Sequence, residues 1–509
     1  MSNSVIIKKR IKEFNKIISV SGDKSISIRW VLLSSLAKGV STAKNLLISE
    51  DVLAAIKSIK KLGIRTTINK NECKIYGKGI NGYNYKKNII LNAENSGTLG
   101  RILLGLLINT TYPIKLIGDR SLSKRDFKRI SDPLSKFGAR FKLKNNKNLP
   151  LTIIGSSDLK PIKYIEKKGS AQCKTSVIFG GFRTTGTTIV KAKKSRNHTE
   201  LMCKYLKLPL KVKYKKDYDE IKINKVKIIK PLNYNIPSDI SSSAFFIVLT
   251  ALSKNSLLVI KNVNINQSRI GIIKILKKMG IIIIFKNKRI YKGEKVADLE
   301  IRSPKSIKSI NCPTKLNSGA IDEFLIIFLV AAKAEGISYF KNLAELNQKE
   351  SPRLKWGGKI LNKMGIKTVT TKDSIKICCE KHGINLPNTY TTETCAFFIW
   401  RTKTFINEAM AEIKATSPDL SATELKIIKA ELLKQPSIKA VSDKLGKVVK
   451  LNDKIKLPIK NLNTLVAQAD QINKLINLDP KQAVMSFVQG QVANLKNQAI
   501  SAVRSFFRF

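Results

Sequence analysis

Residues 37–46 read AKGVSTAKNL, and the same pattern returns as AEGISYFKNL at 334–343 and as KNSLLVIKNV at 254–263. Each copy reads as the end of an apolar helix, a turn of small residues and a strand that ends in Lys-Asn before an apolar residue. Because three distant segments share this order, the sequence indicates an internal repeat.

A second helix is expected after each copy, and it ends in a repeated stop signal. The stops are KLGI at 61–64, KFGA at 136–139, KMGI at 278–281 and KMGI at 363–366, with a weaker copy, YLKLPL, at 205–210. Glycine is the expected left-handed helix terminator at this place. The interval between stops is longer than a solenoid repeat, and strand-like runs such as LTIIG at 151–155 and IIIIF at 281–285 flank the helices. The pattern therefore predicts five βαβ-type modules before residue 380.

Polar residues gather where the first helix of each module is expected to begin. The five openings are GDKSISIR at 22–29, ENSGTLGR at 94–101, GSAQCK at 169–174, SDISSSAFF at 238–246 and IDEFLIIF at 321–328. A helix N-terminus exposes free N–H groups and the positive end of the helix dipole, which suits phosphates and carboxylates. One such opening is usually only a cap. Five in register favour a shared anion site.

Length and charge limit the possible classes of protein. The chain has 509 residues, too many for one ordinary domain, and its formal net charge is +58. Such a charge is compatible with nucleic-acid binding, but the lysines spread along the whole chain and few aromatic residues interleave with them. Lys, Ile and Asn are all abundant, as an AT-rich gene would encode. The same charge would also concentrate small anionic substrates by electrostatic steering.

The cysteines and histidines do not suggest a metal site. There are 7 cysteines without a C-x-x-C pair and only 2 histidines, so neither a disulfide framework nor a zinc site is expected. The start, MSNSVIIKKRIKEF, lacks the apolar core of a signal peptide, and the run IIFLVAA at 326–332 is too short to span a bilayer. We expect a cytoplasmic protein.

Seven motifs, taken in order, carry a resemblance to a known family. They are SGDKSISIR at 21–29, NSGTLGR at 95–101, GDRSLSKR at 118–125, SAQCKTS at 170–176, SRNHTE at 195–200, IDE at 321–323 and QKESPRL at 348–354. The chain from about 20 to about 377 resembles 5-enolpyruvylshikimate-3-phosphate (EPSP) synthases. The resemblance implies an α/β, two-lobed enolpyruvyl transferase fold with the active site between the lobes. It also implies transfer of the carboxyvinyl group of phosphoenolpyruvate to the 5-hydroxyl of shikimate 3-phosphate, with release of phosphate and without a metal or organic cofactor.

The resemblance also implies roles for individual residues. The residues expected to bind shikimate 3-phosphate are Lys24, Ser25, Arg29, Ser170, Ala171, Gln172, Ser195, Asp322 and Lys349. Those expected to bind phosphoenolpyruvate are Lys24, Asn95, Gly97, Arg125, Gln172 and Arg353. Catalysis is assigned to three of the matching residues: Asp322 as the general base for the 5-hydroxyl, and Glu350 with Lys24 for proton transfer at the methylene carbon. Asp239 matches an aspartate at the crossover between lobes and is expected to be structural.

The C-terminal part departs from the family pattern. Members carry a sixth module that opens with Asp-His-Arg, and this triplet occurs nowhere in the sequence. Beyond residue 406 the chain is richer in Ala and Gln, and caps such as Asp479-Pro480 predict helices, including one over 481–507. We therefore expect a mostly helical tail at 406–509, joined by a junction at 381–405. The predicted lobes are 1–20 with 235–380, and 21–234.

Three other functions compete with the first. One is the related transferase that uses UDP-N-acetylglucosamine as acceptor; the K-S-x-S-x-R and S-A-Q-x-K runs favour the shikimate enzyme. Another is a catalytically inactive binding protein of the same fold, and the third is a nucleic-acid binder. The expected partners are the two small substrates and no membrane. A monomer is expected, with a tail that could contact another protein.

Overall fold

The computed structural model describes residues 13–69, 72–349 and 351–379, all within one compact unit, Ile11–Asn385. The predicted junction at 381–405, the predicted helical tail at 406–509 and the catalytic candidate Glu350 lie outside the described residues.

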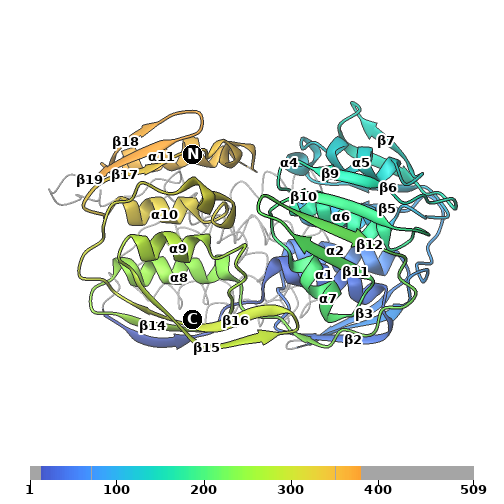
Figure 1. The fold of residues 1–509 in the computed structure, drawn as a ribbon, viewed down its shortest axis with the longest axis horizontal. Helices are drawn as coiled ribbons and strands as arrows, with labels where there is room; N and C mark the ends of the chain where they lie inside the picture. The colour runs from blue at the N-terminus through green and yellow to red at the C-terminus, as the bar shows by residue number, and fades with distance from the viewer. Residues whose placement is uncertain (1–12, 70–71, 350, 380–509) are drawn as a thin grey trace, which may run out of the picture. The chain divides into compact units, whose positions relative to one another are not determined.

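Within the described residues, five sheets follow one connection rule. Figure 1 shows these sheets in two groups, one with β14 to β19 and the other with β2 to β12. In four of them, the first two strands in sheet order are parallel and the other neighbouring pairs are antiparallel. The other three strands are consecutive in the chain once the first is set aside, and the last of them lies between the other two. In sheet order these are β13 (Tyr234–Asn235), β2 (Lys38–Lys44), β4 (Glu72–Lys78) and β3 (Arg65–Asn69); β5 (Ile90–Asn92), β6 (Ile114–Ile117), β8 (Asn148–Ile154) and β7 (Arg140–Lys144); β9 (Lys163–Glu166), β10 (Thr188–Lys193), β12 (Tyr218–Ile223) and β11 (Leu210–Tyr214); and β1 (Asn15–Ile18), β14 (Leu257–Asn264), β16 (Glu294–Arg302) and β15 (Ile282–Tyr291).

The fifth sheet keeps the rule with a reduced first strand. It consists of β17 (Gly336–Phe340), β19 (Ile375–Cys379) and β18 (Lys367–Thr370). Parallel bridges from Lys308 to Glu335 and from Asn311 to Tyr339 stand where the other sheets have a parallel strand. The five-module prediction is therefore confirmed.

Two helices belong to each module, as the repeat predicts. The first helices are α1 (Lys24–Ser35), α3 (Gly97–Leu106), α6 (Ala171–Gly181), α8 (Ile240–Leu252) and α10 (Phe324–Ala331). The second helices are α2 (Glu50–Lys61), α5 (Lys128–Ser135), α7 (His198–Tyr205), α9 (Gly271–Lys278) and α11 (Arg353–Lys363), with α4 (Arg120–Ser123) and two 3-10 helices, Thr314–Gly319 and Ala344–Gln348, between elements. All five polar openings thus stand at helix starts.

The predicted stop signals end helices through a left-handed residue. Gly63, Gly138, Gly280 and Gly365 have φ values of 84°, 117°, 90° and 77°. Glycine adopts this conformation without a steric penalty, so it closes the helix where a side chain would be strained. The weaker stop uses Lys207 instead, with φ of 54°. The asparagine of the repeated Lys-Asn at the strand ends is explained in the same way. Asn45, Asn262 and Asn342 also adopt the left-handed conformation, which asparagine tolerates better than most residues.

The chain passes twice between the two groups of sheets, and the two crossing segments pair with each other. β1 lies parallel to β14, while β13 lies parallel to β2. Where the segments meet, the backbone N–H of Asp23 donates to Pro237 at 2.8 Å and that of Asp239 donates to Ser21 at 3.0 Å. A Cβ on Gly22 would lie 2.0 Å from the carbonyl oxygen of Asn45, so only glycine allows this approach.

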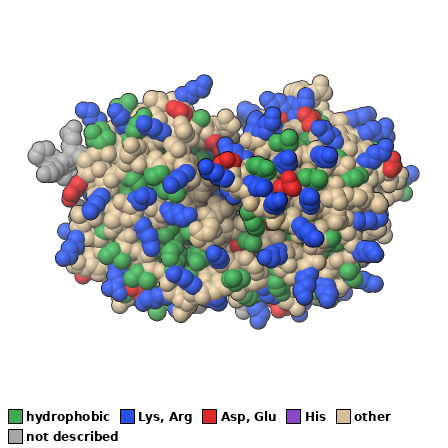
Figure 2. All heavy atoms as spheres, viewed as in Figure 1, with side chains coloured by type: hydrophobic (Ala, Val, Ile, Leu, Met, Phe, Trp, Pro, Cys, Tyr) green, Lys and Arg blue, Asp and Glu red, His purple; other side chains and the backbone are tan. Residues whose placement is uncertain are grey.

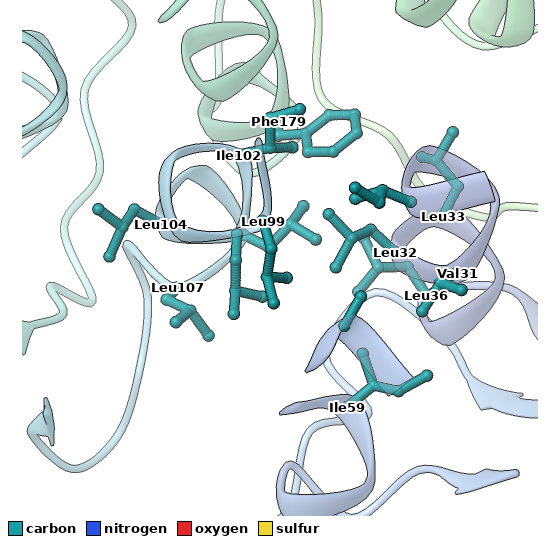
Figure 3. Close-up of a cluster of buried hydrophobic side chains, with 14 of the residues drawn as sticks. Val31, Leu32, Leu33, Leu36, Ile59, Leu99, Ile102, Leu104, Leu107 and Phe179 are labelled. Carbon is teal, nitrogen blue, oxygen red and sulfur yellow. The ribbon is translucent and has the colours of Figure 1, made fainter. Parts of the chain in front are cut away.

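Apolar helix faces hold the first group of modules together. Figure 3 shows Leu32 of α1 on the side of that helix towards Leu99 of α3, and both side chains are fully buried. The interface between α3 and α6 is close enough that a Cβ on Gly105 would lie 2.1 Å from the carbonyl oxygen of Ser176. The packing of α1, α3 and α6 therefore fixes where their N-termini point.

On the face that Figure 2 shows, the positive charge is not concentrated in one patch. Figure 2 shows Lys and Arg side chains scattered across the visible face, with hydrophobic atoms between them. This agrees with the even spread of lysine along the sequence. Among the described residues, none of the helices has the length and apolar character needed to cross a membrane.

Candidate active site

The first turn of α1 presents Lys24 and Ser25. Asp23 caps the helix by accepting a hydrogen bond from the Ile26 N–H at 2.9 Å. The Lys24 side chain is 40% exposed, and its Nζ lies 3.5 Å from Asp51 Oδ2, while Ser25 is buried. The capping aspartate therefore aligns the start of α1 and leaves an accessible ammonium group at its first residue.

Arg29 lies one turn later and is almost fully buried. Its Nε donates to Thr199 Oγ1 at 2.7 Å, its Nη1 to the Ser25 carbonyl at 2.9 Å and its Nη2 to Thr175 Oγ1 at 3.4 Å. Burial lowers the pKa of Arg29 to about 10, although Glu200 and Asp23 act in the opposite direction. The side chain joins α1 to α6 and α7. Its role as a carboxylate clamp stays a prediction.

Two arginines converge on the start of α3. Ser96 caps this helix by accepting from the Leu99 N–H at 3.2 Å. A Cβ placed on Gly97 would lie 2.9 Å from Arg125 Nη1 and 3.1 Å from Arg101 Nη1. The glycine therefore leaves space in front of two guanidinium groups at a positive helix end, which is an arrangement that binds anions.

Gln172 on the first turn of α6 joins this cluster. Arg101 Nη1 donates to Gln172 Oε1 at 2.6 Å, and Gln172 Nε2 donates to Thr98 Oγ1 at 3.0 Å. Burial lowers the pKa of Arg101 to about 10, and the positive charge of Arg125 acts in the same direction. The structure thus brings Gly97, Arg125 and Gln172 together. It adds Arg101, which the sequence reasoning did not single out although it ends the NSGTLGR motif.

The remaining residues of these two helix openings have mainly local roles. Asn95 Nδ2 donates to the carboxylate of Asp119, which itself caps α4. Ser170 caps α6 by accepting from the Cys173 N–H at 3.2 Å, and Ala171 is the first helical residue. Ser195, which precedes α7, has a different environment, because its shielded hydroxyl oxygen has no hydrogen-bond partner among the described residues. A ligand oxygen is one partner that could satisfy it.

Asp322 lies two residues before the first residue of α10 and faces three cations. Arg196 Nη2 donates to its Oδ2, while Lys349 Nζ and Arg353 Nη1 lie 3.6 and 3.7 Å from its Oδ1. Burial opposes ionisation, but Arg196, Lys349 and Arg353 outweigh it and hold the pKa of Asp322 well below its usual range. Glu323, and not Asp322, occupies the cap position of α10.

A buried pair, His198 with Glu294, fixes the segment that carries Arg196. His198, the first residue of α7, has its Nδ1 2.7 Å from Glu294 Oε1 on β16, and both side chains are buried. Glu294 Oε2 also accepts from Asn264 and Asn266 at 3.0 and 3.1 Å. Arg196 belongs to the quoted SRNHTE motif, but no signal in the sequence pairs it with a residue 126 positions away.

The fold recurs in a solved structure of one class of protein. The enolpyruvyl transferase NikO from Streptomyces tendae has a TM-score of 0.57 with this chain, over 74% of this chain and 84% of that one, at 12% identity. At this identity the likeness shows the fold alone. The fold is that of the enolpyruvyl transferases, as the sequence predicts.

Closer similarity identifies the family. EPSP synthase from Acinetobacter baumannii is 34% identical, with a TM-score of 0.67 over 75% of this chain and 85% of that one. The 3-phosphoshikimate 1-carboxyvinyltransferase of Thermoanaerobacter sp. strain X514 is 37% identical over 401 residues, which are 77% of this chain and 92% of that protein. A protein of the same name from Ruthia magnifica is 38% identical over 381 residues, 74% of this chain and 85% of that protein.

The family model of EPSP synthase (3-phosphoshikimate 1-carboxyvinyltransferase) matches residues 8–393. The chain belongs to the EPSP synthase family. The match is longer than the span of about 20 to 377 that the motifs indicated, and it runs into the segment at 381–405 that we expected to be a junction.

Proposed function

We propose that this chain transfers the carboxyvinyl group of phosphoenolpyruvate to the 5-hydroxyl of shikimate 3-phosphate and releases phosphate. The observation that carries the proposal is Asp322, an ionised carboxylate held against Arg196, Lys349 and Arg353. A carboxylate that can accept a proton, set among cations that can bind phosphates and carboxylates, suits a reaction between two anionic substrates.

In this proposal, the start of α3 and the start of α1 each bind one of the two substrates. The start of α3, with Gly97, Arg125 and Gln172, supports a site for phosphoenolpyruvate, to which Arg353 adds a cation. The start of α1, with Lys24, Ser25 and Arg29, supports a site for shikimate 3-phosphate, together with Ser170, Ala171, Ser195 and Lys349. The unpartnered Ser195 hydroxyl favours that assignment because a substrate oxygen would complete its hydrogen bonding.

Substrate binding would make Asp322 a better base. In the free protein three cations hold its pKa low, and a weak base removes a proton from a hydroxyl poorly. Two anionic substrates compete with Asp322 for Arg196, Lys349 and Arg353 and bring negative charge close to it. Both effects raise the pKa of a carboxyl group.

The proton and electron balance needs one further group. As the 5-hydroxyl oxygen bonds to the central carbon of phosphoenolpyruvate, its proton goes to Asp322 and the methylene carbon takes up another proton. The central carbon then loses its carbon–oxygen bond to phosphate, and the methyl carbon beside it loses a proton, which restores the vinyl group. Lys24 and Glu350 are the proposed carriers at that carbon; Glu350 lies outside the described residues.

The absent Asp-His-Arg triplet supports a second candidate function. The resemblance assigns its arginine to phosphoenolpyruvate, so a chain without it is expected to turn over slowly or to bind substrates without reaction. With either function, we propose a cytoplasmic location, a monomeric state and a partner for the tail.

The test is phosphate release measured with phosphoenolpyruvate and each of two acceptors, shikimate 3-phosphate and UDP-N-acetylglucosamine. Release that requires shikimate 3-phosphate supports the proposal, and release only with the nucleotide sugar contradicts it. Calorimetric binding of shikimate 3-phosphate without phosphate release would identify the inactive binding protein instead.

A further inference from the structure

A buried arginine outside the predicted site lies where the two crossing segments meet. Arg269 stands just before α9, and its side chain is 4% exposed. Its Nη1 lies 3.4 Å from Asp23 Oδ2, and its Nη2 lies 3.5 Å from Asp239 Oδ1. One guanidinium group therefore pairs with the caps of both α1 and α8.

The same carboxylates hold the backbone of the site. Asp239 Oδ1 accepts from the Ser241 N–H at 2.7 Å, and its Oδ2 accepts from the Lys24 N–H at 3.0 Å. Asp23 Oδ1 accepts from the Ile26 N–H at 2.9 Å. The position of Lys24 thus depends on two aspartates that share one cation.

A second arm of the network reaches the residue beside Asp322. Arg269 Nη2 donates to Ser241 Oγ at 2.7 Å, and Ser241 Oγ donates to Glu323 Oε1 at 2.5 Å. Glu323 is buried and is the chain neighbour of Asp322. The hydroxyl of Ser241 therefore connects the guanidinium group to the turn that carries Asp322.

The charges explain why this cation is needed. Asp23, Asp239 and Glu323 are three buried carboxyl groups around one guanidinium group. Burial opposes the charged form of Arg269, but Asp23, Asp239 and Glu323 outweigh it and raise its pKa. Without the cation these carboxylates would repel one another, and the starts of α1, α8 and α10 would move apart.

We propose that Arg269 is a positioning residue for the carboxyvinyl transfer, one that holds Lys24 and Asp322 in a single geometry without touching either substrate. Arg269 holds α1 by pairing with the two capping aspartates. It holds the turn before α10 through hydrogen bonds that pass from Ser241 to Glu323. The inference rests on the proposed function, because Lys24 and Asp322 are proposed site groups.

The experiment compares the full chain with two buried-arginine variants, Arg269→Met and Arg183→Met. Arg183 is a matched control, because it is 9% exposed and its Nη1 donates to Asn81 Oδ1 at 2.8 Å, away from this network. For each protein, the affinity for shikimate 3-phosphate is measured by calorimetry, the thermal midpoint by scanning, and the pH profile of phosphate release from about pH 5 to 9.

Arg269→Met is expected to weaken shikimate 3-phosphate binding roughly tenfold or more, as a displaced anchor does. It should also move the acid limb of the profile upward by roughly 1 pH unit, because a cation close to Asp322 is lost. Arg183→Met should change neither. The proposal is overturned if Arg269→Met keeps wild-type affinity and an unmoved acid limb, or if both variants change affinity and pH profile equally.

Should Arg269→Met fail to fold, Ser241→Ala decides, because it keeps every charge and removes only the linking hydroxyl. A loss of affinity of roughly threefold or more supports the proposal, and wild-type affinity overturns it. Failure of the proposed function has a separate signature: the wild-type chain then releases no phosphate with shikimate 3-phosphate as acceptor, while the comparison of shikimate 3-phosphate affinities still decides the role of Arg269.

Discussion

Arg196 Nη2 donates a hydrogen bond to Asp322 Oδ2, although the two residues lie 126 positions apart and come from different groups of modules. Lys349 and Arg353 complete the cationic surroundings of the same carboxylate. This contact ties the segment ahead of α7 to the start of α10. It makes Asp322 the residue on which the proposed chemistry most depends.

Asp322→Asn is expected to lower phosphate release by a factor of roughly 100 or more, because an amide cannot take the proton of the 5-hydroxyl. Shikimate 3-phosphate should still bind, since Arg196 and Lys349 remain. The measurement is phosphate release alongside calorimetric binding. Asp158→Asn serves as the control, because that aspartate is 82% exposed and its ion pair is with Lys160. Equal activity of the two variants would remove Asp322 from the mechanism.

Gly97→Ala is expected to raise the KM for phosphoenolpyruvate roughly tenfold or more, with little change in the KM for shikimate 3-phosphate. The added Cβ would lie 2.9 Å from Arg125 Nη1, so the guanidinium group must shift. Gly100→Ala is the matched control on the same helix, because the nearest neighbours of its Cβ are the Ala93 and Phe127 side chains and not Arg125. A KM for phosphoenolpyruvate that does not change in Gly97→Ala would count against this placement.

Arg101→Met tests the arginine that the sequence reasoning missed. Methionine keeps an apolar stem beside the Phe127 ring, over which Arg101 now lies at 5.4 Å, but it cannot donate to Gln172. Loss of a charged hydrogen-bonding group predicts a KM for phosphoenolpyruvate raised roughly tenfold or more. Arg140→Met, at an exposed site, should leave it unchanged. Similar steady-state constants in both variants would limit Arg101 to a structural role.

Glu323 predicts a pH dependence of stability. Burial and the neighbouring charge of Asp322 raise the pKa of Glu323 from its ordinary 4.5 to about 7. Between these values the native state binds a proton that the unfolded chain has lost, so this group's contribution to the free energy of unfolding falls as pH rises through that window. The contribution is full below the lower value and gone above the upper one.

Glu323→Gln has no such titration, so the wild type should lose stability relative to it between about pH 5 and pH 8. The loss is at most about 3 kcal/mol at about 1.4 kcal/mol per pKa unit. Denaturant unfolding at both pH values measures it, with the exposed Glu335→Gln as control. Parallel pH curves for the wild type and Glu323→Gln would contradict the assignment.

Local signals in the sequence were enough to predict the five modules. A capping side chain such as Asp23 or Ser170 acts on the next turn of its own chain, and the stop at Gly63 depends only on the φ that glycine tolerates. These causes act over a few residues, so they can be read without knowing the fold. The family motifs added the expected site residues because they occur in a fixed order.

Partners of charged side chains could not be predicted in that way. Arg101 with Gln172, Arg196 with Asp322, and Arg269 with Asp23 join segments that the sequence does not place side by side.

The sequence by itself determined five modules, their helix starts and their glycine stops, since capping and backbone preference are short-range effects. Only the tertiary structure decided which cation faces which carboxylate, because ion pairing depends on distances that the packing of distant helices sets.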